Sequence, residues 1–436
     1  MDPGNNNDEQ TAIQEKANLS ESKFNNNDSY NQTSFSRNLV RSILHLLCII
    51  LLYAAVICIV VFTRLGNINY TPPGNQYLFP PLTTVKSEMI PPSVNVSSFR
   101  ADVAYEHLRY LARTPHPWNT AANQDNLDYI TMVLTELQKL AKSSGVKMEI
   151  VSEDPTVFTT TSSSVNFFNS NSKNKTTSSY AYLEGRNILA RIVGTENDFE
   201  NAILLSSHID SVQVSPGATD DGINGAAMLE IARHIIFNRL KSTIVFNFNN
   251  GEEIGLFGAI AFMHHEWAST IKAFINIEGG GAGGAAMVFR SSNYDVVKHY
   301  SHRESSYVSK WRPHANVFSN DAFKFGSINS KTDFTVYTAY GIPGLDIAFY
   351  ERRSLYHTSH DSIENAPIGS LDQVGNSVLN TIKSMSDDPQ YLKKPLGSLQ
   401  QDSIYYDFLG RVVISYSITI GYVIYALMLV FIPIIY

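Results

Sequence analysis

Residues 202–211, AILLSSHIDS, place a short apolar run directly before a histidine and an aspartate. An apolar run of this length that ends in polar residues is typical of a buried β-strand. Comparable runs occur further along the chain: TIVFNF at 243–248, AFINI at 273–277 and GLDIAF at 344–349. Apolar residues at helical spacing fill 99–111, 123–141, 225–238 and 256–267. This alternation predicts an α/β fold with a mixed, mostly parallel sheet and helices on both faces.

Histidine and acidic side chains follow each of these expected strands. They are His208 and Asp210, Glu252 and Glu253, Glu278, and His357 and Asp361, and the segment GATDDG adds Asp220 and Asp221. Because the carboxyl ends of parallel strands meet at one edge of an open sheet, we expect these residues to lie close together. Taken singly, each pattern is weak, since acidic pairs before helices are often caps.

Carboxylates crowded at one edge would repel one another and raise each other's pKa unless a cation neutralised them. The chain has only two cysteines, Cys48 and Cys58, and both lie in an apolar run, so a metal site has to use histidine and carboxylate ligands. Two histidines with three carboxylates suit Zn²⁺, and a pair of divalent ions would neutralise the whole cluster.

Taken together, HIDS, GATDDG, NNGEE, INIEGGG and YHTSHD resemble the M28 metallopeptidases, a family of zinc aminopeptidases with two co-catalytic metal ions. Within that family, three segments are most similar to the membrane-bound branch found in the fungal vacuole and next most similar to the branch found in the endoplasmic reticulum. These segments are PHPWN, FNNGEEIGLFGA and KTDF. The similarity extends over about residues 99–380 and the preceding apolar segment.

The resemblance implies a role for each residue. His208 and Glu278 would bind one zinc, Glu253 and His357 the other, and Asp220 would bridge both. Glu252 would be the general base, because a carboxylate beside a metal-activated water can pass its proton to the leaving amine. Asp210, two residues after His208, would orient that imidazole. Tyr356 would donate a hydrogen bond to the oxyanion.

The expected function is that of a membrane-anchored, zinc-dependent exopeptidase with two Zn²⁺ ions, acting on peptides as an aminopeptidase. An inactive receptor or scaffold on the same fold is an alternative, which the complete ligand set with Glu252 disfavours. A glutaminyl-cyclase-like transferase with one zinc is another, which the two-metal ligand set disfavours. A net charge of −7 without a Lys/Arg-rich run argues against a nucleic-acid partner. The oligomeric state stays open.

The remaining sequence predicts a membrane topology. Residues 1–41 are expected to form a disordered, cytosolic polar tail, and residues 42–63 a transmembrane helix. A linker at 64–98 then leads to the peptidase domain at 99–390. A second linker at 391–411 is expected to lead to a second transmembrane helix at 412–436. Lys and Arg gather before the first apolar segment, which places the catalytic domain across the membrane. N-glycosylation sequons at Asn69, Asn95 and Asn174 agree with a lumen. We expect the lumenal side of the vacuolar membrane, with the endoplasmic reticulum membrane as the alternative.

Overall fold

The computed structural model describes residues 14, 39–59, 99–152, 154, 156–161, 180–302, 312–397 and 401–435. The expected linker 64–98 and nearly all of the expected tail lie outside the described residues. The chain divides into two units, residues 1–63 and 64–436.

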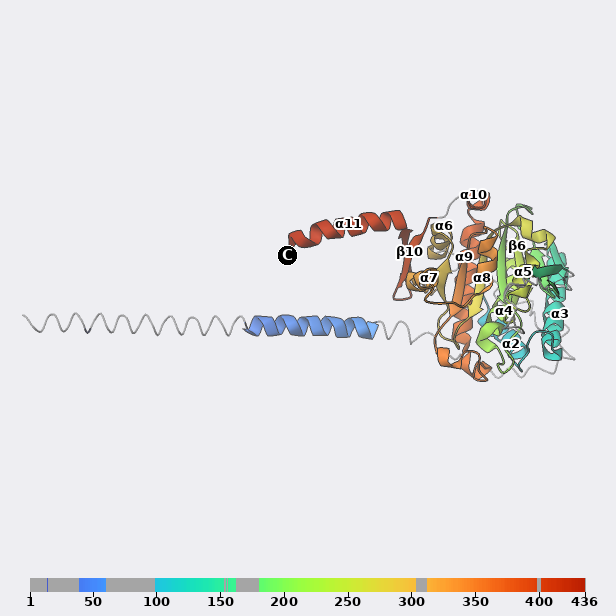
Figure 1. Ribbon diagram of the computed structural model, residues 1–436, viewed down its shortest axis with the longest axis horizontal. Helices are drawn as coiled ribbons and strands as arrows, with labels where there is room; N and C mark the ends of the chain where they lie inside the picture. The colour runs from blue at the N-terminus through green and yellow to red at the C-terminus, as the bar shows by residue number, and fades with distance from the viewer. Residues whose placement is uncertain are drawn as a thin grey trace, which may run out of the picture. The chain divides into compact units, whose positions relative to one another are not determined.

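The first unit contains the helix Leu39–Ile59, which begins three residues before the expected segment 42–63 (Figure 1). Within the described residues it is the one helix long and apolar enough to cross a membrane. Its large apolar side chains, such as Leu51 and Leu52, are exposed.

The second unit is built on a seven-stranded mixed sheet. Its order is β1 (Met148–Val151), β4 (Ile188–Ile192), β6 (Ile244–Asn249), β5 (Ala202–His208), β7 (Ile271–Gly279), β9 (Gly344–Phe349) and β8 (Met287–Ser291). The four strands β6, β5, β7 and β9 run parallel, and the flanking ladders β1–β4, β4–β6 and β9–β8 are antiparallel. A separate two-stranded sheet pairs β2 (Val157–Thr161) with β3 (Tyr180–Glu184). The predicted fold class is confirmed.

The central strands are buried on both faces because successive side chains point to opposite sides of the sheet. In β5, Ile203 and Leu205 pack into one core, and Ala202 and Leu204 into a second. The first core receives α2 (Ala101–Leu111), α3 (Ala121–Ser143), α4 (Ile223–Phe237), α6 (Tyr294–Ser301) and α9 (Ile368–Ser386). The second receives α5 (Phe257–Phe262) and α8 (Asp333–Ala339).

The helix expected at 256–267 is divided in the structure. α5 ends at Phe262, and a separate 3₁₀ helix covers Glu266–Thr270. His265 leaves the helical conformation, and its ring accepts a hydrogen bond from the backbone N–H of Trp267, which caps the second segment. A local cap therefore interrupts an apolar pattern that suggested one helix.

The C-terminal bounds differ from those expected. Instead of a linker at 391–411 and a helix from 412, the structure has α10 (Pro389–Leu392), an antiparallel pair of β10 (Ser403–Phe408) with β11 (Val412–Ser417), and α11 (Ile418–Ile435). Val413 is buried in the domain whereas Val412 is exposed. This two-residue periodicity makes 412–417 a strand, a distinction that the apolar content of the segment does not reveal.

Candidate metal centre

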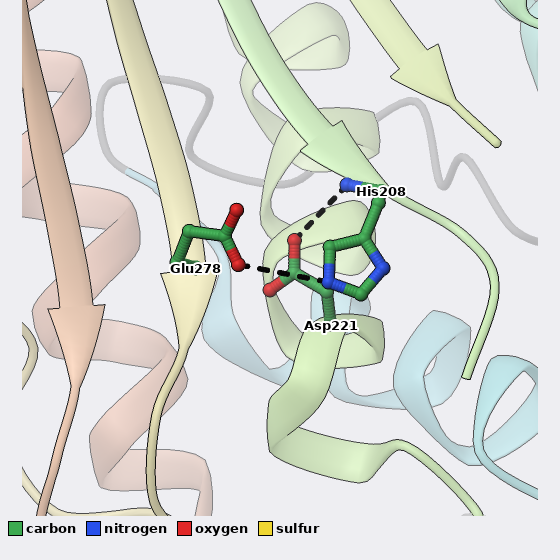
Figure 2. Close-up of side chains that lie close together, drawn as sticks. All are labelled: His208, Asp221 and Glu278. Atoms are coloured by element: carbon green, nitrogen blue, oxygen red, sulfur yellow. Dashed lines mark hydrogen bonds and ion pairs between the residues drawn. The ribbon is translucent and has the colours of Figure 1, made fainter. Parts of the chain in front are cut away.

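His208 ends strand β5, and both nitrogens of its imidazole have partners; Figure 2 shows the ring contact with Glu278. Nδ1 lies 2.9 Å from the backbone carbonyl oxygen of Asp210 and donates a hydrogen bond to it, because a carbonyl oxygen can only accept. In the neutral ring, the lone pair of Nε2 then points toward the carboxylates of the candidate centre. Nε2 lies 3.2 Å from Oδ1 of Asp220 and 3.6 Å from Oε2 of Glu278. These two carboxylates reach the histidine from different elements, the segment 218–222 and strand β7.

The two oxygens of Asp220 face different histidines. Oδ1 faces His208, whereas Oδ2 lies 3.0 Å from Nε2 of His357. The same His357 nitrogen lies 3.1 Å from Oε1 of Glu253. His357 adopts a φ of 58°, which a residue with a Cβ seldom takes, so the loop after β9 holds this ring in place at a conformational cost.

The structure thus brings the five expected ligands together in two overlapping groups. His208, Asp220 and Glu278 form one group, and Asp220, Glu253 and His357 form the other. Possible ligand atoms of His208, Asp220 and Glu253 all lie within 4.8 Å of one another, as do those of His208, Asp221 and Glu278.

Asp361 holds the backbone of the segment that carries Asp220, and Asp221 holds the end of strand β5. The carboxylate of Asp361 accepts hydrogen bonds from the backbone N–H groups of Thr219 and Asp220, at 2.8 and 3.0 Å. Asp221 accepts from the backbone N–H of His208 at 3.1 Å and from the Ser207 hydroxyl at 2.6 Å. Sequence reasoning gave neither aspartate a role, although both lie inside the motifs GATDDG and YHTSHD.

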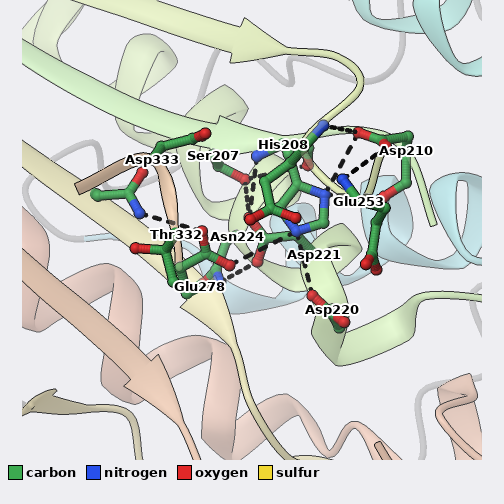
Figure 3. A network of polar contacts seen from close by, with 12 residues as sticks. Ser207, His208, Asp210, Asp220, Asp221, Asn224, Glu253, Glu278, Thr332 and Asp333 are labelled. Carbon is green, nitrogen blue, oxygen red and sulfur yellow. Dashed lines mark hydrogen bonds and ion pairs between the residues drawn. The ribbon is translucent and has the colours of Figure 1, made fainter. Parts of the chain in front are cut away.

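Asp210 supports the centre in a way that the sequence did not suggest. Its carboxylate oxygen lies 3.6 Å from Nδ1 of His208, and the backbone carbonyl makes the shorter contact. The carboxylate instead accepts hydrogen bonds from the backbone N–H groups of Gly251, Glu252 and Glu253, at 2.8, 3.1 and 3.2 Å (Figure 3). Asp210 therefore fixes the loop that carries the two glutamates relative to β5.

Glu252 and Tyr356 lie beside the ligands. Burial and the neighbouring Glu278 hold the pKa of Glu252 well above its usual range. The Tyr356 ring stacks on His357 with ring centroids 3.7 Å apart. Burial and the nearby carboxylates, Asp220 first, raise the pKa of the Tyr356 hydroxyl, so this group keeps its proton and can donate.

A buried polar chain extends from Glu278 into the domain. Asn276 donates to Oε1 of Glu278 at 3.2 Å and to Oδ1 of Asp346 at 3.1 Å. Asp346 in turn forms an ion pair with Arg290 at 2.5 Å and accepts from the Thr332 hydroxyl at 2.8 Å. Arg290 is buried, and it anchors the chain that holds Glu278.

The donor set fits a cation. Within the described residues, no hydrogen bond reaches the buried atoms Oε1 of Glu253 and Nε2 of His357. Burial raises the pKa of Glu278, and although burial opposes it, the adjacent carboxylates of Asp220 and Glu253 raise the pKa of His357 to about 9. No lysine or arginine in the described part of the chain forms an ion pair with the five ligands. Imidazole and carboxylate donors arranged in this way are those that Zn²⁺ takes.

Comparison with known proteins agrees with the geometry. Residues 187–382 match the family Peptidase family M28. The chain carries an M28 peptidase domain. The resemblance expected from the motifs is thereby confirmed, and all five expected ligands lie inside the matched residues.

Two relatives of the M28 domain are vacuolar membrane proteases of fungi. That of Yarrowia lipolytica is 36% identical over 310 residues, and that of Schizosaccharomyces japonicus is 38% identical over 287 residues. The alignments cover 70% and 65% of this chain but 30% and 31% of the relatives, so the chain spans less than a third of their length. Among solved structures, an aminopeptidase from Aneurinibacillus sp. strain AM-1 is 15% identical, with a TM-score of 0.48, and the match covers 67% of this chain and 95% of that one.

Proposed function

We propose that the M28 domain is a zinc-dependent peptidase that removes residues from the N-terminus of peptides. The observation that carries the proposal is Asp220, whose two oxygens face His208 and His357 at 3.2 and 3.0 Å. A carboxylate turned toward two histidines in this way suits a pair of metal ions that share one bridging ligand.

His208, Asp220 and Glu278 would hold the first zinc, and Asp220, Glu253 and His357 the second. When bound, zinc supplies Lewis acidity toward the peptide carbonyl and acidifies water. Asp210 and Asp361 keep the ligand loops in register through their hydrogen bonds to backbone N–H groups. The polar chain from Glu278 to Arg290 does the same for strand β7.

Glu252 is the residue that moves a proton. It is adjacent to the expected ligand Glu253, and a carboxylate in that position can accept a proton from water and release it to the leaving amine. The Tyr356 hydroxyl, still protonated, would donate a hydrogen bond to the oxygen that becomes negative in the transition state. Both residues act without themselves binding the metal.

The same proposal includes the cellular setting. The helix Leu39–Ile59 would anchor the chain in a vacuolar membrane with the M28 domain in the lumen. The charge asymmetry around the apolar segment and the names of the fungal relatives support this placement. Peptides in the lumen would be the substrates.

The test uses the full chain purified in detergent. Glu252→Gln should lower kcat on an aminoacyl reporter by about a hundredfold or more, because it removes the base, and should leave the zinc content unchanged. Glu253→Gln should lower the zinc content as well, and Glu196→Gln, at an exposed position, should change neither quantity. Loss of zinc from Glu252→Gln alone would show that the roles of the two glutamates are exchanged.

The product distinguishes the reaction classes. Incubation with an unmodified peptide should release its residues one by one from the N-terminus. Cyclisation of a peptide with an N-terminal glutamine, without hydrolysis, would identify a transferase. Zinc binding without turnover of either substrate would favour the receptor or scaffold.

A further inference from the structure

The hairpin of β10 and β11 has an apolar outer face. Its register opposes Ile404 to Tyr416, Tyr406 to Ile414 and Phe408 to Val412. Residues opposite one another in an antiparallel pair point to the same side, and the intervening residues point to the other. These six side chains, called here the hairpin face, therefore share one side of the pair. Phe408 is 60% exposed, Val412 53% and Tyr406 42%.

The other side of the hairpin is fixed to the M28 domain. Tyr405 and Val413 are buried in the first core of the M28 domain, described above. The backbone N–H of Asp407 donates to the carbonyl of Ala315 at 2.9 Å, and the Asp407 carboxylate accepts from the backbone N–H of Ala315 at 3.3 Å. The hairpin face consequently has a fixed orientation relative to the metal centre.

The neighbouring helix α7 (Val317–Lys324) adds exposed aromatic residues. It contacts β10, and Asn316, its N-cap, forms a β-bridge with Tyr406 (Figure 1). Phe318 is 74% exposed and Phe325, just after the helix, is 83% exposed. Exposed apolar side chains gathered in this way indicate a surface that meets something other than water.

The next element of the chain indicates what that surface meets. α11 follows β11 directly, and its first turn packs on the hairpin, where a Cβ added at Gly421 would lie 2.5 Å from Cδ1 of Ile404. Its residues from Tyr422 to Ile432 are apolar and exposed. α11 is shorter than the helix Leu39–Ile59: its eighteen residues extend about 27 Å, less than the roughly 30 Å of hydrocarbon in a bilayer, which is enough for it to enter the bilayer. α11 is apolar and exposed from Tyr422 on, about one turn after its start, so its entry into a bilayer would place Ile418 near the hydrocarbon boundary and the hairpin at the level of the lipid headgroups.

The hairpin suits that level. Tyrosine and other aromatic side chains are enriched where the apolar and polar parts of a membrane meet. A two-stranded sheet has open edges, and the backbone groups along these edges need hydrogen-bond partners such as water or lipid headgroups. Since the hydrocarbon offers no such partners, the sheet cannot lie inside it. We propose that the hairpin face lies against the lipid surface at the point where α11 enters the bilayer, and that it holds the M28 domain at a fixed tilt to the membrane. This inference rests on the membrane anchoring in the proposed function.

The test places single cysteines in the full chain, after Cys48→Ala and Cys58→Ala have removed the native thiols. Phe408→Cys and Ile414→Cys report on the hairpin face, Val423→Cys reports on α11, and Val214→Cys is a control at an exposed apolar residue after β5. Each variant is labelled with an environment-sensitive fluorophore and reconstituted in phosphatidylcholine vesicles that contain a lipid spin-labelled near its headgroup. Zinc content and peptidase activity are measured on every sample.

We expect quenching at positions 408 and 414 to be about threefold stronger than at 214, and quenching at 423 to show that α11 is inserted. The inference would be overturned if position 423 is quenched but positions 408 and 414 are quenched as weakly as position 214. If, in that case, the fluorophore emission at 408 and 414 shifts to the blue as the protein concentration rises, a second copy of the chain is the occupant of the hairpin face. Absence of quenching at 423 as well would overturn the inference, because α11 would then not enter the bilayer, and would leave the anchor Leu39–Ile59 in place. Retained zinc content and activity in such samples would leave the proposed chemistry standing.

Discussion

Asp220 faces both histidines of the candidate metal centre, and its backbone is held there because its own N–H and that of Thr219 each donate a hydrogen bond to Asp361. Asp220→Ala should therefore empty both metal positions, whereas His357→Ala should weaken mainly one, because the bridging carboxylate serves two ions and the histidine one. Metal content per chain, measured by mass spectrometry after dialysis, checks this. Loss of one ion in each variant would contradict the bridge.

A second prediction concerns the buried pair of Arg290 and Asp346. Arg290→Met leaves Asp346 as an unpaired charge in the interior, so unfolding should become easier by about 3 to 5 kcal/mol. Arg113→Met removes an exposed pair with Asp125 and should cost at most about 1 kcal/mol. Denaturant unfolding of the two variants at neutral pH makes the comparison. Similar losses of stability would mean that the buried pair is not the anchor of the Glu278 chain.

The expected ligands could be recognised in the sequence because each follows a strand or a glycine turn within a short motif. The supporting residues could not, because their partners are distant along the chain. Asp361 accepts hydrogen bonds from backbone groups about 140 residues earlier. The three bonds that Asp210 accepts from residues 251–253 exist only because β5 and β6 are neighbours in the sheet.

At the scale of elements, the four parallel strands were predictable and the flanking ones were not, including β4, which is buried on both faces. β9 has the expected bounds, and β5, β6 and β7 lie within a few residues of theirs. β1 and β8, the outermost strands, were not predicted because each has fewer apolar residues in a row. β11 was mistaken for part of a helix because it is as apolar as the helix α11 that follows it, and β10 was expected to be part of a linker.

The packing of α2 on α3 should make stability depend on pH. Nδ1 of His107 lies 2.8 Å from the Tyr129 hydroxyl, and burial, followed by the charge of Arg233, lowers the pKa of His107 to about 4. The folded protein keeps this ring neutral, while the unfolded chain protonates it below about pH 6.5. Its contribution is thus complete above pH 6.5 and is lost as the pH falls toward 4.

His107→Gln removes this titration. The difference in stability between pH 7.5 and pH 4.5 should shrink in that variant by roughly 2 to 3 kcal/mol relative to the unaltered chain. His264→Gln, at an exposed histidine, should leave the difference unchanged. Thermal unfolding at both pH values provides the measurement, and parallel behaviour of the two variants would exclude His107 as the source.

At the scale of the whole molecule, the sequence predicts that the helix Leu39–Ile59 separates a cytosolic tail from a lumenal M28 domain. Glycosylation takes place only in the lumen, so Asn69, Asn95 and Asn174 are candidate acceptors, whereas Asn18 and Asn31, which also head sequons, should stay unmodified. Expression of the full chain in a eukaryotic cell should give a protein whose electrophoretic mobility shifts after glycosidase treatment. The shift should disappear when the three asparagines after the helix are changed to glutamine. Its persistence in that variant, and its loss when Asn18, Asn27 and Asn31 are all changed to glutamine, would place the tail in the lumen and the M28 domain on the opposite side of the membrane.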